Sequence, residues 1–322
     1  MKILLATHPF GQFDAAPLKL LAASGMEIIV NPVRRRLKES DMLQLPTDID
    51  GIIAGTEPYT AEVIRRLSPR LKVIARAGIG LDNIDFDACR ECSVEVTYTP
   101  DAPSQAVAEL ALAQMLNLAR LIPQSDRSVR AKAWNRLTGV LLSECTIGLL
   151  GLGRIGSRVA RLLQPFGTRV IAHELKPDHA LAASLGVTLV DFDSLLRQSD
   201  ILSLHIPGGT ANHNLIGRGA ISRMKTGAVL VNTARGSIVD EEALADALLQ
   251  EHLAGAALDV FHQEPYEGIF SRMDKVILTA HIGASTRQSR HDMEFGAAED
   301  CLRVLNGLPA LRPTPESEMA ER

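Results

Sequence analysis

The chain has few cysteines, no strong excess of either charge and no long uninterrupted apolar run. Four cysteines in 322 residues are too few for a disulfide scaffold, which favours a reducing, cytoplasmic setting. A formal net charge of −4 gives no electrostatic basis for binding nucleic acid or an anionic membrane. With 24 glycines and 16 prolines, the chain is also no low-complexity linker. What remains is an ordinary globular protein, whose length predicts two domains.

The longest apolar stretch, residues 106–122, carries polar residues at helical spacing: Glu109, Gln114, Asn117 and Arg120. This pattern predicts a buried amphipathic helix that is too short and too polar to span a membrane. The opening residues MKILLATHPF predict a first strand and not a signal peptide, because histidine and proline follow the apolar run at once.

Short β-rich runs alternate with helical patterns in two blocks of the chain. The first block, to about residue 100, contains KILLAT, MEIIV, GIIAG, KVIAR and VEVTY, with a helical pattern at 61–67. The second block, from about Cys145, contains TIGLLG, RVIAHE, ILSLHIP, AVLVNTA, AGAALDV and KVILTAH. Continuous apolar strands separated by helices indicate parallel sheets covered on both faces, so we predict an α/β fold throughout.

Two further helices are expected in the second half of the chain. One covers 241–250, with Asp240 as its N-cap, and the other covers roughly 286–306 and returns to pack on the first block. The final stretch, LRPTPESEMAER, is polar and contains proline, so we expect a loose tail.

The strongest local motif is GLGRIG at residues 151–156, which follows an apolar strand and opens a helix. Gly151 permits a tight turn, Gly153 lets the backbone approach a pyrophosphate, and Gly156 lets the helix pack close to the strand. The phosphates would then meet the free N–H groups of the helix N-terminus. The plain alternative is a glycine turn without a ligand.

Glu174 ends the next strand, eighteen residues after Gly156. A carboxylate there can accept hydrogen bonds from the adenine-ribose hydroxyls and would repel a 2′-phosphate, which favours NAD over NADP. The alternative is an ordinary exposed glutamate at a strand end.

Three chemically useful residues follow later strands of the second block: Arg235, Glu264 and His281. Ligands of doubly wound sheets bind beyond the carboxyl ends of the strands. Arginine can hold a 2-keto carboxylate, histidine can carry the alcohol proton near neutral pH, and a carboxylate can orient the histidine. Each residue alone could be an ordinary surface or turn residue, but together they predict a catalytic site.

The sequence resembles the D-isomer-specific 2-hydroxyacid dehydrogenase family from about Gly51 to Gly307. The resemblance is carried by GLGRIG, LHIPGGTANHNLI, VNTARGSIVDEEAL, AGAALDVFHQEP and TAHIGAST. It implies a Rossmann cofactor domain, residues 101–286, inserted into a flavodoxin-like substrate domain, residues 1–100 and 287–322. It also implies NAD as the cofactor, a D-2-hydroxy acid or 2-keto acid as the substrate, and Arg235, Glu264 and His281 as the catalytic triad.

The resemblance extends to the residues that bind the cofactor and the substrate. It places Ala77 and Gly78, in the loop ARAGIGLDNID, against the substrate carboxylate. The implied cofactor contacts are Gly151, Gly153, Arg154, Ile155, Gly156, Glu174, His205, Pro207, Thr233, Ala234, Asp259 and Gly283.

The segments AGIGLDNID, HIGAST and KAWNR look most like 3-phosphoglycerate dehydrogenases, which implies that Arg76 and Arg136 bind a substrate phosphate. Gly55 stands where many of those enzymes carry another arginine, and Arg76 could instead pair with Asp82 or Asp85. Glyoxylate or hydroxypyruvate is therefore the alternative substrate, and an NAD-binding corepressor is the alternative function. The family also implies a homodimer built through residues 106–142. For the CxxC pair Cys89 and Cys92 we expect no metal, because further ligands at suitable spacing are missing.

Overall fold

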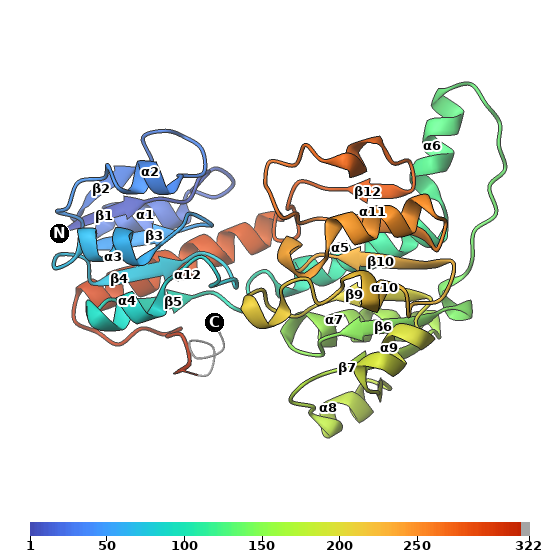
Figure 1. Cartoon of the computed structure of the whole chain (residues 1–322). Helices are drawn as coiled ribbons and strands as arrows, with labels where there is room; N and C mark the ends of the chain where they lie inside the picture. The colour runs from blue at the N-terminus through green and yellow to red at the C-terminus, as the bar shows by residue number, and fades with distance from the viewer. Residues whose placement is uncertain (317–322) are drawn as a thin grey trace. The chain divides into compact units, whose positions relative to one another are not determined.

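The computed structural model describes residues 1–316, and the chain divides into two compact units. Unit 1 consists of Met1–Pro103 together with the described segment from Ser285 onward, and unit 2 is Ser104–Ala284. Each unit contains one parallel sheet (Figure 1). The predicted α/β class with parallel sheets is thereby confirmed.

Unit 1 has a five-stranded sheet in the order β2-β1-β3-β4-β5, which is the flavodoxin-like order. One face packs on α2, α3 and α4, and the other packs on α1 and α12. Both faces are buried, which is why the strands are continuous apolar runs. The strands are β1 (Lys2–Leu5), β2 (Glu27–Val30), β3 (Gly51–Ala54), β4 (Val73–Arg76) and β5 (Glu95–Tyr98). The helices are α1 (Ala16–Ala23), α2 (Glu39–Met42), α3 (Ala61–Leu67), α4 (Phe86–Glu91) and α12 (Arg287–Leu305).

The segment after α12 does not begin as the loose tail that its composition predicts. The Thr314 N–H donates to the Val96 carbonyl, and the Tyr98 N–H donates to the Arg312 carbonyl, so the segment runs along edge strand β5. The Arg312 guanidinium also pairs with the buried Asp300 carboxylate at 2.9 Å. Residues 317–322, the rest of the expected tail, lie outside the described residues.

Unit 2 has a seven-stranded sheet in the order β12-β11-β10-β9-β6-β7-β8. The strand order reverses between β6 and β9, the switch point at which doubly wound sheets bind ligands. Its strands are β6 (Thr146–Leu150), β7 (Arg169–His173), β8 (Thr188–Leu189), β9 (Ile201–Leu204), β10 (Ala228–Asn232), β11 (Leu253–Leu258) and β12 (Val276–Leu278). Its helices are α5 (Ser104–Ala119), α6 (Ile122–Arg130), α7 (Arg154–Leu163), α8 (His179–Ser184), α9 (Phe192–Gln198), α10 (Arg218–Ile221) and α11 (Glu241–Leu249).

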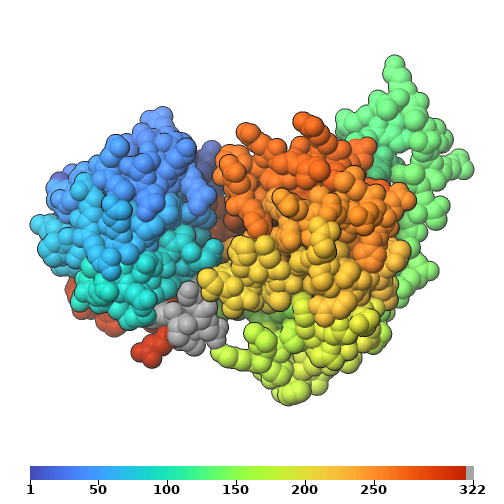
Figure 2. Space-filling view, viewed as in Figure 1, coloured from blue at the N-terminus to red at the C-terminus, as the bar shows by residue number. Residues whose placement is uncertain are grey.

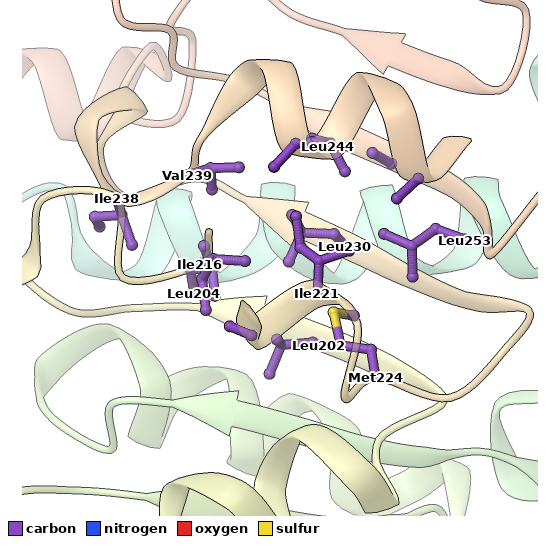
Figure 3. Close-up of a cluster of buried hydrophobic side chains, with 14 of the residues drawn as sticks. Leu202, Leu204, Ile216, Ile221, Met224, Leu230, Ile238, Val239, Leu244 and Leu253 are labelled. Carbon is purple, nitrogen blue, oxygen red and sulfur yellow. The ribbon is translucent and has the colours of Figure 1, made fainter. Parts of the chain in front are cut away.

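Two apolar layers enclose the sheet of unit 2. Residues of α9, α10 and α11 pack on one face, where Leu202, Leu230 and Leu244 are buried between strands and helices (Figure 3). Residues of α5, α7 and α8 pack on the other face. The sheet is therefore held rigidly, and its strand ends form a firm platform for side chains.

The helix predicted over 106–122 is α5, which ends three residues earlier than predicted. Helix α5 ends at Ala119, Leu121 adopts a left-handed conformation with φ +52°, and α6 begins at Ile122. Pro123 explains the break, because it has no N–H for the Ala119 carbonyl and would clash with it in a continuous helix. That carbonyl accepts the Val140 N–H at 2.9 Å instead. Helix α11 and helix α12 have the predicted bounds to within two residues, with Asp240 and Thr286 as N-caps.

Among residues 1–316, no single helix is long and apolar enough to cross a membrane. The bent pair α5 and α6 meets that test of length and composition only when its two helices are joined. Most of the apolar side chains of α5 are already buried against the sheet of unit 2.

Helix α6 and residues 131–141 form an arm that stands out from the body of unit 2 (Figure 2). No residue of α6 is buried. Large apolar side chains of the arm are exposed: Ile122, Val129, Trp134, Leu137, Val140 and Leu141.

Candidate active site

Arg235, Glu264 and His281 all lie just beyond the ends of neighbouring strands in unit 2. Asn232 of β10, Leu258 of β11 and Leu278 of β12 stand in one line across the sheet. The three predicted catalytic residues follow this line by three to six positions. They therefore share one edge of a rigid sheet, where each backbone is fixed before its side chain leaves it.

The structure brings His281 and Glu264 into direct contact. Nδ1 of His281 lies 2.9 Å from Oε2 of Glu264, and the two side chains are 39% and 30% exposed. The other carboxylate oxygen, Oε1, accepts the Phe261 N–H at 3.2 Å. Because Glu264 occupies Nδ1, the Nε2 atom of the ring is left for proton transfer, and the carboxylate favours a proton on Nδ1.

Asp259 fixes the backbone that carries His281. Its carbonyl accepts the His281 N–H at 2.8 Å, and its carboxylate accepts the N–H groups of Ile282 and Gly283, each at 2.8 Å. The Asp259 carboxylate is 1% exposed, so these bonds form away from water. They hold His281 at φ +51°, a left-handed conformation that a residue with a side chain rarely adopts. Asp259 was predicted only as a cofactor contact.

Arg235 is placed by a second buried polar residue, which the sequence analysis missed. Asn232, 1% exposed, donates from Nδ2 to the Arg235 carbonyl at 2.8 Å and accepts the Ala234 N–H at 3.0 Å. Nη1 of Arg235 donates to the Ala234 carbonyl at 2.7 Å. A polar residue at the end of an apolar strand was the available sequence signal.

The glycine loop lies at the switch point of the sheet, after β6. Gly151 has φ +97°, and a side chain at Gly156 would collide with the Gly151 carbonyl oxygen. At Gly153, by contrast, an added Cβ would meet no described atom within 4 Å. Arg154 and Ile155 open α7 directly after it. The loop thus has open space beside a helix N-terminus, which is what a bound pyrophosphate requires.

Glu174 reaches back to this loop. Its Oε2 accepts the Leu152 N–H at 2.9 Å, and its Oε1 accepts the Lys176 N–H at 3.2 Å. The carboxylate therefore lies at the glycine loop rather than pointing away as an ordinary surface glutamate would. This position fits the recognition of a ribose next to the pyrophosphate.

His205 follows β9 on the other side of the switch point. Its Nε2 lies 3.0 Å from the Ser203 hydroxyl, and Nδ1 is buried without a hydrogen-bond partner in the part of the chain that the structure describes. Burial lowers the pKa of His205 to about 4, so the ring is neutral at physiological pH. A neutral ring suits a pocket wall better than a proton donor.

The other predicted cofactor residues lie along the same edge of unit 2. Thr233 is 7% exposed, and among residues 1–316 its hydroxyl has no hydrogen-bond partner, so a polar group of a cofactor could satisfy it. Ala234 follows it, Pro207 follows His205, and Gly283 is held by Asp259. These groups fit a dinucleotide.

The two arginines predicted to bind the substrate, Arg76 and Arg136, lie in different units. Arg76, in unit 1, is 7% exposed, and its guanidinium binds the Gly80 carbonyl at 3.1 Å and the Ala77 carbonyl. It packs against Gly78, so its contacts support the loop that contains Ala77 and Gly78. Arg136 is exposed on the arm of unit 2.

Cys89 and Cys92 lie at the end of α4, with Cys92 as its C-cap. Burial raises the pKa of Cys89 to about 12, which disfavours the thiolate needed for redox or metal chemistry. Both thiols are free.

Known proteins share this fold and much of this sequence. Residues 112–283 match the model of the D-isomer specific 2-hydroxyacid dehydrogenase, NAD binding domain. The D-3-phosphoglycerate dehydrogenase of Synechocystis is 38% identical over 86% of this chain and 51% of its own length. The hydroxypyruvate reductase of Thermotoga maritima is 36% identical over 84% of this chain and 89% of its own length.

Solved structures agree with the sequence matches. The D-lactate dehydrogenase of Aquifex aeolicus, complexed with NAD and lactic acid, superposes with a TM-score of 0.84 and 26% identity, over 95% of this chain and 96% of that one. The chain spans about half the length of the curated D-3-phosphoglycerate dehydrogenases that it matches. The match over residues 112–283 and the relative covered over most of its length identify the family, so this chain belongs to the D-isomer specific 2-hydroxyacid dehydrogenases, with their NAD binding domain in unit 2.

Proposed function

We propose that the protein interconverts a D-2-hydroxy acid and its 2-keto acid with NAD. The observation that carries this proposal is the 2.9 Å contact between His281 Nδ1 and Glu264 Oε2 at the strand ends of an NAD-binding unit. It is the arrangement expected of a histidine that moves a proton at its other ring nitrogen. In this proposal unit 2 binds the cofactor, and the loop that contains Ala77 and Gly78 binds the substrate carboxylate.

The residues of the proposed site have separate roles in binding and in proton transfer. The N–H groups at the start of α7 bind the pyrophosphate, and Glu174 binds the adenine ribose. NAD bound at these residues would supply hydride transfer between the hydroxy acid and the keto acid. Arg235 binds the substrate carboxylate and polarises its carbonyl, and His281 gives or takes the proton at Nε2. Glu264 orients the ring through its contact with Nδ1.

For the substrate itself we propose two candidates, 3-phosphohydroxypyruvate and an unphosphorylated acid such as hydroxypyruvate or glyoxylate. Similarity to D-3-phosphoglycerate dehydrogenases supports the first. The bonds from Arg76 to its own loop carbonyls favour the second, because they leave less of the guanidinium for a phosphate. If Arg76 binds phosphate, Arg76→Ala raises KM for 3-phosphohydroxypyruvate by about tenfold or more, and raises KM for hydroxypyruvate far less. Equal increases would assign Arg76 to the loop.

The deciding experiment is NADH oxidation with a panel of 2-keto acids that includes these three. Turnover of at least one acid, abolished by His281→Ala, is the expected result. NADH binding without turnover of any acid would favour the alternative, an NAD-binding corepressor that uses the same scaffold. Binding is measured separately, by the change in NADH fluorescence.

We also propose a homodimer that covers the arm of unit 2. Trp134 is 78% exposed and Leu141 is 57% exposed, which is unusual for large apolar side chains so close in sequence. Light scattering at micromolar concentration tests this, and a monomer would refute it. Trp134→Ser is expected to shift the equilibrium toward the monomer.

A further inference from the structure

Three polar side chains, two of them buried, connect helix α5 to the strand end that carries His281. Gln114, 3% exposed, has its Nε2 3.5 Å from the Thr279 hydroxyl. The Thr279 hydroxyl lies 2.6 Å from Oδ1 of Asp259. Asp259, in turn, binds the N–H groups of Ile282 and Gly283. All three side chains belong to unit 2, although Gln114 and Thr279 are 165 positions apart in the sequence.

The direction of each hydrogen bond in this chain follows from its chemistry. An ionised carboxylate can only accept, so the Thr279 hydroxyl must donate its single proton to Asp259. That hydroxyl can then only accept from helix α5, which is why Gln114 must present its NH₂ group. Gln114 donates to Thr279, and Thr279 donates to Asp259.

The bond from Thr279 restrains the carboxylate on which the histidine loop depends. Oδ1 of Asp259 receives both the Thr279 hydroxyl and the Ile282 N–H, so rotation of the carboxylate would break both bonds at once. The left-handed conformation of His281 is strained and persists only where its surroundings hold it. Without the hydroxyl, Asp259 has one anchor fewer, and the loop gains freedom to relax.

Gln114 contacts Thr279 from helix α5 and is the residue of the three that lies farthest from His281 in this chain of hydrogen bonds. It stands on a helix whose other buried side chains are mostly apolar or small, and its Oε1 has no hydrogen-bond partner among the described residues. A buried amide is costly unless it is hydrogen-bonded, so the Thr279 contact is what stabilises it there. Because that contact is long, Gln114 has a weaker effect than Thr279.

We propose that Thr279 and Gln114 are positioning residues for His281: they hold Asp259, which holds the histidine at Glu264. This inference rests on the proposed role of His281 in proton transfer. It assigns no contact between either residue and the substrate or the cofactor.

Activity provides the first test. Thr279→Val keeps the shape and removes the hydroxyl, and it is expected to lower kcat about tenfold with little change in the KM for NADH. Thr279→Ser restores kcat, and Gln114→Leu lowers kcat about two- to threefold. A Thr279→Val enzyme with wild-type kcat would overturn the proposal.

Amide hydrogen exchange provides a second test that needs no turnover. In Thr279→Val the amides of Ile282 and Gly283 are expected to exchange about tenfold faster or more, while amides of β6 and β7 keep their rates. Thr279→Ser and the packing control Met115→Leu, a buried neighbour of Gln114 on α5, leave these amides unchanged. If the wild-type protein turns over no keto acid, the proposed function fails, but exchange still decides the linkage. Uniformly faster exchange in Thr279→Val would reduce Thr279 to a general stabilising role and refute positioning.

Discussion

The contact between Glu264 and His281 predicts how far the proposed activity falls when the carboxylate charge is removed. Glu264→Gln keeps the side-chain length and loses the negative charge 2.9 Å from Nδ1. A hydrogen bond to a charged group contributes about 1.5–3 kcal/mol when buried. Because the two side chains are 30–39% exposed, water screens the pair, and we expect it to contribute about 1 kcal/mol.

A loss of about 1 kcal/mol of transition-state stabilisation corresponds to about a fivefold lower kcat/KM. In the proposed mechanism His281 gives its proton to the keto acid, so Glu264→Gln should lower kcat/KM for keto-acid reduction by about this factor. The assay is kcat/KM for keto-acid reduction, with saturating NADH. Glu267→Gln, an exposed glutamate three residues further on, is the matched control. Equal kcat/KM values for the wild-type protein and Glu264→Gln would show that the pair does not act in catalysis.

Three other predictions use different residues of the site. His281→Ala should lower kcat by about 10²–10⁴ while NADH still binds, as followed by stopped assays and NADH fluorescence; wild-type turnover would remove His281 from the mechanism. Glu174 should make kcat/KM with NADH higher than with NADPH, and equal use of NADPH would show that a nearby basic residue rescues the phosphate. Since burial lowers the pKa of His205 to about 4, the unfolded protein binds the proton first, and stability falls as pH drops from about 6.5 toward 4. Urea unfolding at pH 8 and at pH 5 measures how much unfolding free energy each protein loses between these two pH values. The loss should be about 2 kcal/mol smaller in His205→Gln than in the wild-type protein. An equal loss in both proteins would contradict the neutral ring.

Patterns formed by residues that are adjacent in the sequence predicted the fold well. Buried parallel strands are continuous apolar runs, so β1 and β6 could be located from composition alone. Strand β8 has only two residues, Thr188 and Leu189, and gives no such signal. The break at Leu121 was missed because the apolar periodicity continues across it, although Pro123 could have indicated that Ala119 ends the helix.

The site was predictable to the extent that strand ends share one edge of a sheet. That rule places Arg235, Glu264 and His281 near one another, but it says nothing of which side chains hold the backbone between them. Asn232 binds the Arg235 carbonyl and the Ala234 N–H of its own loop, and Thr279 binds Asp259, which follows the neighbouring strand. Such pairings depend on the exact loop conformation and strand register. The sequence could not predict the partners of Arg76 either, because an arginine before a glycine loop can face a ligand or the loop itself.

The backbone strain at His281 connects these observations. A histidine at φ +51° is unfavourable by about 1–3 kcal/mol, yet three consecutive N–H groups, from His281 to Gly283, all bond to Asp259. At about 1 kcal/mol each, those bonds are sufficient to offset the strain. The bonds to Asp259 restrain the backbone of His281, and the contact with Glu264 restrains its ring. In the proposed role of His281 as the proton carrier, such restraint limits the reorganisation needed during the reaction, which is the condition under which electrostatic groups contribute most to catalysis.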